Sequence, residues 1–128
     1  MRIAFLDSQT AFWLASGDKR LSPASLSSIN SHSQTLISSI TIAELEMKAA
    51  IGRLPLPENL VKLFESAGVT VQPFSADAAM QLRRFPQLNR HDPFDRMILA
   101  QAASNFGANF FTSDEALIRL GLDWVVAV

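Results

Sequence analysis

Four acidic residues are spread along the chain at positions that could assemble one reactive site: Asp7, Glu44, Asp95 and Asp114. Carboxylates that gather within a few ångströms repel each other, and at least one stays protonated unless a positive group lies among them. A hard divalent cation removes this repulsion, and Mg²⁺ or Mn²⁺ prefers oxygen ligands of this type. Such an ion activates a bound water and neutralises a phosphodiester in line for attack. If the four groups converge, the chemistry that they predict is hydrolysis of a phosphate ester.

Each carboxylate taken alone also has an ordinary structural explanation. Thr41 and Glu44 have the spacing of a capping box, in which the two side chains satisfy free backbone donors at a helix start. The segment 92–95, DPFD, combines a cap residue, a first-turn proline and an acidic residue, which is typical of a helix start. Asp114 could cap a following helix, and Asp7 could belong to a turn. Only convergence of the four side chains distinguishes a metal site from these separate roles.

The elements that would position these residues are short strands and helices in alternation. The predicted strands are residues 2–6, 35–39, 69–71, 109–112 and 124–126. The predicted helices are residues 9–15, 23–30 with Ser22 as the cap, 41–51, 57–67, 75–84, 93–106 and 115–120. Strands that alternate with helices imply a parallel sheet that is covered on both faces.

The predicted topology gives a reason for the four carboxylates to meet. In an open sheet of this kind, functional groups gather beyond the carboxyl ends of the strands. Asp7 ends the first predicted strand and Asp114 follows the fourth, while Glu44 and Asp95 fall in the first turns of helices. Helix starts carry partial positive charge and free N–H groups, which suit carboxylates.

Length and composition restrict the class of protein. The chain has 128 residues, which fits one domain spanning 1–128, and its 48% hydrophobic and 18% charged residues are typical of a globular protein. A formal net charge of -1 argues against a broad basic surface, so any contact with nucleic acid must be local. The absence of cysteine excludes a disulfide framework, a thiolate nucleophile and a cysteine-ligated zinc site.

No apolar run approaches the roughly 20 residues that are needed to cross a bilayer. The N-terminus becomes acidic at Asp7 and lacks the longer apolar region of a signal peptide. The expectation is therefore a cytoplasmic protein without membrane contact.

Four segments resemble the motifs of PIN-domain proteins. The segment 90–101, RHDPFDRMILAQ, is similar to their third acidic motif, and 5–13, FLDSQTAFW, to their opening strand and helix. The segment 41–48, TIAELEMK, followed by GRL at 52–54, resembles the second motif, and 111–115, FTSDE, the fourth. The motifs come in the family's order over nearly the whole chain. Together they resemble a VapC-type toxin of a bacterial or archaeal toxin–antitoxin pair.

This resemblance implies an α/β fold, a three-layer α/β/α sandwich around a short, mainly parallel sheet, and a Mg²⁺- or Mn²⁺-dependent endoribonuclease. By position, the family's acidic quartet corresponds to Asp7, Glu44, Asp95 and Asp114. Asp7, Asp95 and Asp114 would be the chief metal ligands, and Glu44 would orient the attacking water or hold a second ion. The resemblance also implies an RNA substrate cut to a 5′-phosphate and a 3′-hydroxyl, an antitoxin that blocks the site, and a homodimer.

Two positions depart from the family pattern. Ser8 and Gln9 follow Asp7, where many relatives have threonine followed by histidine or asparagine. The hydroxyl of Ser8 could still orient a ligand. Ala43 stands before Glu44, where relatives often have tryptophan. Neither departure changes the acidic quartet.

The remaining polar residues are interpreted as structural or solvated. His91 is expected to be a solvent-facing loop residue, and Asp92 a helix cap. Arg96 is expected in an ion pair on the helix flank, and Glu46 faces away from the site because it lies two residues after Glu44. A basic loop, Arg83, Arg84 and Arg90, could contact an RNA backbone but is better explained by solvation. The apolar stripe Leu60, Leu63 and Phe64 is expected in the core.

Two other classes of protein fit the sequence less well. A catalytically silent PIN fold that only binds RNA or protein would be expected to lose some of the four carboxylates, and all four are present. A phosphoacceptor domain of the receiver type would need a lysine at a late strand end. The lysines of this chain are Lys19, Lys48 and Lys62, and none occupies such a position.

Overall fold

A sheet of five parallel strands forms the centre of the computed structural model, which describes residues 2–52 and 54–128. The strands are β1 (Ile3–Leu6), β2 (Gln34–Ser38), β3 (Thr70–Gln72), β4 (Asn109–Thr112) and β5 (Val125–Ala127). Their spatial order is β3-β2-β1-β4-β5, and every neighbouring pair is parallel. Met1 and Arg53, the latter within the GRL segment that resembles a family motif, lie outside the described residues.

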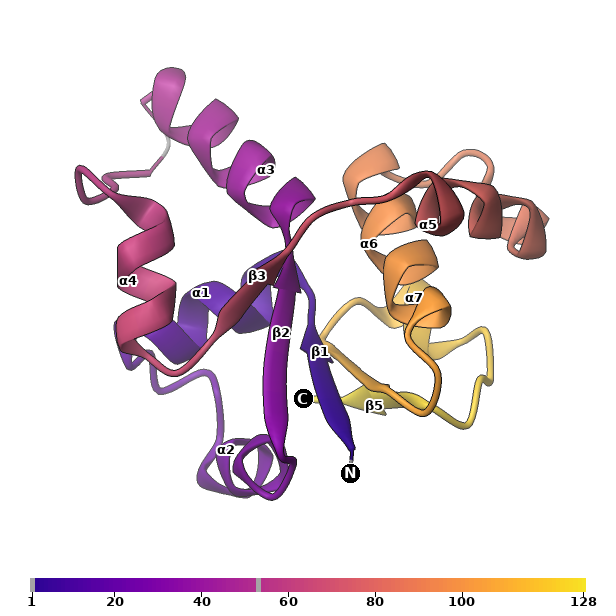
Figure 1. The fold of residues 1–128 in the computed structure, drawn as a ribbon, viewed down its shortest axis with the longest axis horizontal. Coiled ribbons are helices and arrows are strands. Elements are labelled where there is room, and N and C mark those ends of the chain that lie inside the picture. The colour runs from indigo at the N-terminus through magenta and orange to yellow at the C-terminus, as the bar shows by residue number, and fades with distance from the viewer. Residues whose placement is uncertain (1, 53) are drawn as a thin grey trace.

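Helices cover both faces of this sheet. The helices are α1 (Ser8–Ser16), α2 (Pro23–Asn30), α3 (Ser39–Ala50), α4 (Leu60–Ser66), α5 (Ala76–Met80), α6 (Pro93–Ser104) and α7 (Glu115–Ile118). Two 3₁₀ turns, Gln81–Arg84 and Pro86–Leu88, join α5 to α6. Figure 1 shows α1, α3 and α4 on one side of the sheet and α5, α6 and α7 on the other. The three-layer α/β/α sandwich with a parallel sheet is therefore confirmed.

Alternating side chains on each strand fill two separate cores. On β1, Leu6 packs in the core beneath α1 and α4, whereas Phe5 packs in the core beneath α6. Neighbours on β4 divide in the same way, with Phe111 in the first core and Phe110 in the second. Both faces of these strands are buried, which explains why the strands are continuous apolar runs rather than alternating ones. Among the described residues, no helix combines the length and apolar content required to cross a membrane.

The predicted capping box at the second acidic motif is wrong. The helix α3 begins at Ser39, and its cap is Ser38, whose side chain accepts a hydrogen bond from the backbone N–H of Ile40. This earlier start places Glu44 in the second turn rather than the first. Thr41 is buried inside the helix, and its hydroxyl lies 3.0 Å from the hydroxyl of Ser8. A serine at the end of a buried strand competes successfully with the later Thr-x-x-Glu pattern.

Two other predicted helices are shorter than expected. The helix predicted over 57–67 begins at Leu60 with Asn59 as its cap, because the preceding segment contains Pro55 and Pro57. The helix predicted over 75–84 ends at Met80 and tightens into a 3₁₀ turn. Phe85 precedes a proline, which disfavours helical backbone at that residue and ends the turn. The helix at 23–30 and the strand at 109–112 have the predicted bounds.

A buried amide network fixes α6 against the carboxyl ends of β2 and β3. Gln101 on α6 is buried, and its carbonyl oxygen accepts a hydrogen bond from Ser38. Its amide nitrogen donates to the backbone oxygen of Gln72 at 3.0 Å, and Asn105 donates to the side-chain oxygen of Gln72 at 2.9 Å. Because Ser38 also caps α3, the network joins the helix that carries Glu44 to α6.

The strand order creates a switch point between β1 and β4. The chain proceeds from β1 outward to β2 and β3, and then returns to place β4 on the opposite side of β1. Connections on the two sides of such a point diverge, which leaves a crevice beyond the carboxyl ends of the two strands. Asp7 directly follows β1, and Asp114 comes two residues after β4. Both therefore lie at the position where the fold supplies a crevice.

The burial pattern predicts that two phenylalanines on either side of Gly107 contribute very differently to the free energy of unfolding. Phe110 is fully buried, with its ring centroid 6.3 Å from that of Phe5, whereas Phe106 is fully exposed. We expect Phe110→Ala to lower the free energy of unfolding by about 3–5 kcal/mol, since it removes a core ring and leaves a cavity. Phe106→Ala should change it by less than about 0.5 kcal/mol. Urea titration of both variants measures the difference, and similar losses would contradict the described core.

Candidate active site

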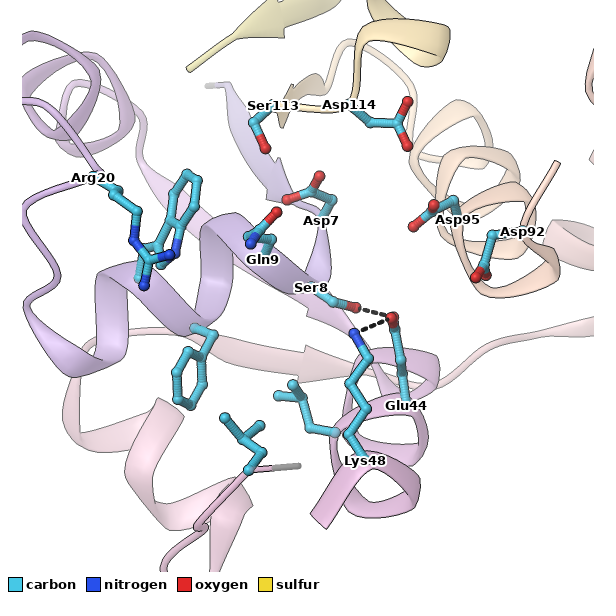
Figure 2. A pocket seen from close by; sticks show the side chains of 14 residues that line it. Asp7, Ser8, Gln9, Arg20, Glu44, Lys48, Asp92, Asp95, Ser113 and Asp114 are labelled. Carbon is cyan, nitrogen blue, oxygen red and sulfur yellow. Dashed lines mark hydrogen bonds and ion pairs between the residues drawn. The ribbon is translucent and has the colours of Figure 1, made fainter. Parts of the chain in front are cut away.

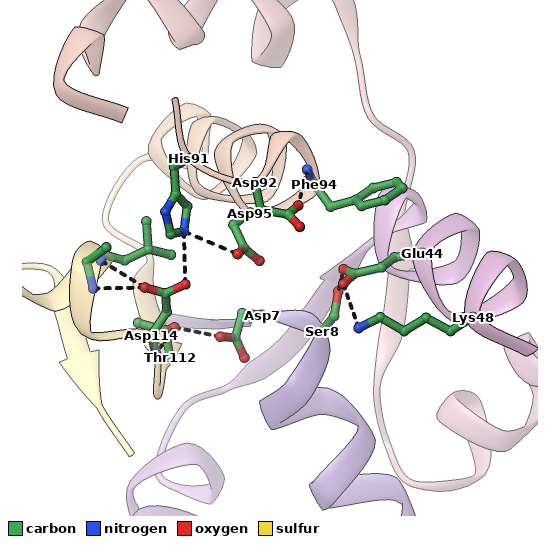
Figure 3. Close-up of polar contacts among 12 residues, drawn as sticks. Asp7, Ser8, Glu44, Lys48, His91, Asp92, Phe94, Asp95, Thr112 and Asp114 are labelled. Atoms are coloured by element: carbon green, nitrogen blue, oxygen red, sulfur yellow. Dashed lines mark hydrogen bonds and ion pairs between the residues drawn. The ribbon is translucent and has the colours of Figure 1, made fainter. Parts of the chain in front are cut away.

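Asp7 is buried at the end of β1, where both of its carboxylate oxygens accept hydrogen bonds. It caps α1 by accepting from the backbone N–H of Thr10 at 2.8 Å through Oδ1. Its Oδ2 accepts from the hydroxyl of Thr112 at 2.5 Å (Figure 3). Two ordinary features, a cap and a strand-end hydroxyl, hold this carboxylate at the centre of the crevice.

Asp114 is held by the start of α7. Its Oδ1 accepts from the backbone N–H groups of Ala116 at 2.8 Å and Leu117 at 3.3 Å. Its own backbone N–H donates to the hydroxyl of Thr112 at 3.0 Å, the same hydroxyl that contacts Asp7. Thr112 therefore fixes the positions of both aspartates relative to each other.

His91 is not the solvent-facing loop residue that was expected. Its Nε2 lies 3.0 Å from Oδ2 of Asp114 and 3.3 Å from Oδ2 of Asp95 (Figure 3). The ligand atoms of these three residues all lie within 4.8 Å of one another. Sequence reasoning missed one signal: His91 comes four residues before Asp95, a spacing of about one helical turn.

Asp92 and Asp95 occupy the first turn of α6 with different roles. Asp92 is the predicted helix cap, since its side chain accepts from the backbone N–H of Phe94 at 2.8 Å. Asp95 points toward Asp7 and Asp114, as Figure 2 shows. Arg96 donates at 3.4 Å to the backbone oxygen of Asn89, a neutral contact in place of the expected ion pair. Of this segment, His91 and Asp95 are the residues that approach Asp114.

Glu44 is held by two neighbours at the other end of the site. Its Oε1 accepts a hydrogen bond from Ser8 at 2.7 Å, and its Oε2 lies 3.0 Å from the ammonium of Lys48 on the same helix. The hydroxyl of Ser8, which was considered as a ligand-orienting group, thus orients Glu44. Lys48 was not predicted as a site residue, although its spacing of four from Glu44 is that of a helical ion pair.

All four acidic residues of the predicted quartet line one pocket of about 460 Å³ (Figure 2). The residues that line this pocket are Asp7, Ser8, Gln9, Phe12, Trp13, Arg20, Glu44, Leu45, Lys48, Leu54, Asp92, Asp95, Ser113 and Asp114. The basic loop Arg83, Arg84 and Arg90 is not among them. Among the residues that the structure describes, the positive side chains of the lining are instead Arg20 and Lys48, which sequence reasoning did not single out.

The carboxylates strongly influence each other's ionisation. Burial raises the pKa of Asp7, and the hydrogen bonds from Thr10 and Thr112 offset this only in part. Burial, together with repulsion from the nearby carboxylates, raises the pKa of Asp95 to about 7. Burial also acts to raise the pKa of Asp114, but hydrogen bonds from His91 and the backbone of α7 outweigh it and the net direction is down. A cation bound among these side chains would favour their charged forms.

The donor set suits a hard divalent cation. Carboxylate oxygens from Asp7, Asp95 and Asp114 are the ligands that Mg²⁺ and Mn²⁺ prefer, and the imidazole of His91 is compatible with Mn²⁺ and other transition metals. His91 is close to two of these oxygens, whereas Asp7 reaches Asp114 through Thr112. The group with the closest ligand atoms thus includes a histidine, in place of the purely acidic group that was expected.

The fold is an α/β/α sandwich with an acidic pocket at the switch point of its sheet. This combination indicates a class of protein, which comparison with known families identifies. The profile of the PIN domain matches residues 4–122, and the chain belongs to the PIN-domain family. A comparison by sequence with curated proteins found no match.

Solved structures share the fold over almost the whole chain. VapBC from Salmonella typhimurium, bound to DNA, matches with a TM-score of 0.66 and 22% identity over 100% of this chain and 98% of that one. A toxin–antitoxin complex from Klebsiella pneumoniae matches with a TM-score of 0.66 and 21% identity over 96% of this chain and 95% of that one. VapBC2 from Rickettsia felis, bound to a promoter DNA fragment, matches with a TM-score of 0.64 and 16% identity over 98% of this chain and 97% of that one. At these identities the likeness concerns the fold.

The raised pKa of Asp95 predicts an inverse dependence of stability on pH in the metal-free protein. The ordinary aspartate pKa of 3.8 rises to about 7 at Asp95 in the folded state, so between these values the folded protein binds one proton more than the unfolded chain. Stability therefore falls as pH rises through this window. Asparagine does not titrate, so Asp95→Asn is the reference. Relative to this variant, we expect the Tm of the wild type in a chelator to drop as the pH rises from about 4 to about 8.

Differential scanning fluorimetry over this pH range, with Asp77→Asn as the matched control, measures the effect. Asp77 is an exposed aspartate in the first turn of α5. A constant difference between wild type and Asp95→Asn at every pH would show that Asp95 is not perturbed as described.

Proposed function

We propose that this protein is a metal-dependent endoribonuclease and the VapC-type toxin of a toxin–antitoxin pair. The observation that carries the proposal is the convergence of Asp7, Glu44, Asp95 and Asp114 on one pocket at the switch point of a PIN fold. The raised pKa of Asp95 supports a cation there, because four clustered carboxylates need a positive group to ionise together.

Asp7, Asp95 and Asp114 hold a Mg²⁺ or Mn²⁺ ion in this proposal, and His91 is positioned to assist at Asp95 and Asp114. When bound, the ion supplies an activated water and neutralises charge on the phosphodiester. Thr112 keeps Asp7 and Asp114 in register, and the backbone N–H groups of α7 keep Oδ1 of Asp114 turned toward the helix. Asp95 would have to be deprotonated to serve as a ligand, with its proton passing to water.

Glu44 orients the attacking water. Ser8 and Lys48 each contact one of its oxygens, at 2.7 Å and 3.0 Å, which fixes the carboxylate plane. An oxygen that accepts one hydrogen bond still has capacity to accept another from water. Hydrolysis then leaves a 5′-phosphate and a 3′-hydroxyl on RNA.

The toxin assignment is supported by the kind of structures that share the fold. Among those that match over nearly the full length, one is a toxin–antitoxin complex, and two are VapBC and VapBC2, each bound to DNA. By analogy we propose an antitoxin that blocks the pocket, a homodimer, and a cytoplasmic location. We also propose that residues 1–128 act as one functional unit.

Substitution of the site carboxylates should abolish cleavage without loss of the fold. We expect Asp95→Asn to lower the Mn²⁺-dependent cleavage rate of single-stranded RNA by at least about a thousandfold, because it removes charge from the cation site. Glu44→Gln should cost roughly a hundredfold, as for loss of a water-orienting group. Glu46→Gln, on the same helix but exposed and outside the pocket, is the matched control and should cleave like the wild type. Normal cleavage by Asp95→Asn would contradict the assignment.

Metal affinity should rise with pH, because Asp95 must lose its proton before it can bind a cation. A ligand must be deprotonated before it binds a cation, and the pKa of Asp95 is about 7. We therefore expect the affinity for Mn²⁺, measured by calorimetry without RNA, to rise as pH increases through this value and to release a proton. A catalytically silent scaffold would show no Mn²⁺ binding that depends on Asp7 or Asp95, and that result would favour a binding module instead.

A further inference from the structure

An RNA strand that enters this pocket meets an electrostatic difficulty. The lining contributes five carboxylates, and the protein as a whole has a formal net charge of -1. A divalent cation compensates the phosphate at which hydrolysis takes place. Each neighbouring phosphate carries its own negative charge and needs a separate positive contact.

Two positive side chains, Arg20 and Lys48, line the same pocket. In Figure 2, Arg20 lies beyond Gln9, on the side of Asp7 that faces away from Asp95, whereas Lys48 lies beside Ser8 and Glu44. Arg20 follows α1, and Lys48 is on α3, so the cations approach from two separate elements. A strand that crosses the pocket would pass the cation site and meet a positive group on the far side.

The ion pair of Lys48 does not prevent it from contacting a phosphate. Its ammonium lies 3.0 Å from Oε2 of Glu44, and its side chain remains 47% exposed. A lysine has three donors, of which this contact uses one. The ammonium therefore has donors left for a phosphate while it keeps its contact with the buried carboxylate of Glu44.

Arg20 is already ordered in one orientation. Its Nε and Nη2 donate to the carboxylate of Asp18 at 3.1 Å and 2.7 Å, and its guanidinium lies 5.3 Å from the ring centre of Trp13. These contacts leave the Nη1 amino group without an acceptor among the described residues. An arginine whose plane is fixed in this way loses less conformational entropy when it binds a phosphate.

We propose that Arg20 and Lys48 bind the RNA phosphates next to the one that is cleaved, and so set the path of the strand across the pocket. The inference rests on the proposed nuclease function and identifies how that site holds its substrate. The basic loop Arg83, Arg84 and Arg90, which could also contact an RNA backbone, does not line the pocket.

Binding is tested apart from cleavage with a short fluorescent single-stranded RNA, in Ca²⁺ so that the strand is held but not turned over. The variants are Arg20→Met and Lys48→Met, which keep the aliphatic stems and remove the charges. The matched controls are Arg119→Met, whose arginine pairs with Glu115 at 2.9 Å, and Lys62→Met on α4, since neither residue lines the pocket. A parallel Mn²⁺ titration without RNA reports on the metal site alone, and Mn²⁺-dependent cleavage by the wild type is measured separately.

We expect each pocket variant to weaken RNA binding roughly tenfold, and to flatten the slope of log Kd against log salt by about 0.7, as for one lost phosphate contact. The controls should stay within about twofold. Lys48→Arg should restore binding. Metal affinity should not weaken in Lys48→Met, because this change leaves Glu44 without its positive partner and makes the pocket more negative.

The outcomes separate this inference from the proposed function. RNA binding that is equal in the pocket and control variants, while the wild type cleaves, would overturn the phosphate contacts and leave the nuclease intact. Binding that depends on Arg20 and Lys48 without any cleavage would support these contacts and overturn hydrolysis. A wild-type protein that does not bind the RNA at all would overturn both.

Discussion

Burial of closely spaced carboxylates, reinforced by their mutual repulsion, is the constraint on which the site beyond β1 and β4 depends. Asp7 is buried and Asp95 has a pKa of about 7, so the folded protein holds these groups where water alone cannot stabilise their charges. A fold keeps such an arrangement only if the surrounding structure fixes it. The hydrophobic packing on both faces of the sheet supplies that rigidity, and a bound cation would convert the repulsion into attraction.

Small polar residues perform much of the positioning, together with Lys48 at Glu44. Thr112 donates to Asp7 and accepts from the backbone of Asp114, which ties together groups from opposite ends of the chain. Ser8 does the same for Glu44 on α3. One layer further in, the hydroxyl of Ser38 donates to the buried side chain of Gln101 and so holds α3 against α6. Neutral donors can orient a carboxylate without cancelling the negative charge that a cation requires, which is why hydroxyls and amides suit this task.

The sequence predicted the parts of the structure that local patterns determine. The strand at 109–112 has a clear apolar run, and the helix at 23–30 has a clear cap. The rule that functional groups gather beyond the carboxyl ends of parallel strands correctly predicted that Asp7 and Asp114 share one pocket. The missed features are tertiary. His91 precedes its helix, and only the position of α7 shows that it reaches Asp114. The capping box failed for the same reason, because the end of β2, and not the Thr-x-x-Glu pattern, determines where α3 begins.

Charge is distributed unevenly over the pocket, and this has an electrostatic consequence. Asp92, Asp95 and Asp114 lie together, while Arg20 and Lys48 come from two other elements, and each is paired with a carboxylate. Lys48 has donors left beside its contact with Glu44, so it can hold that carboxylate and contact an anion at the same time. A cation among the acidic side chains would lower their repulsion of a polyanion, and a bound polyanion would favour the cation in return. Under the proposed function the two binding events would therefore be linked.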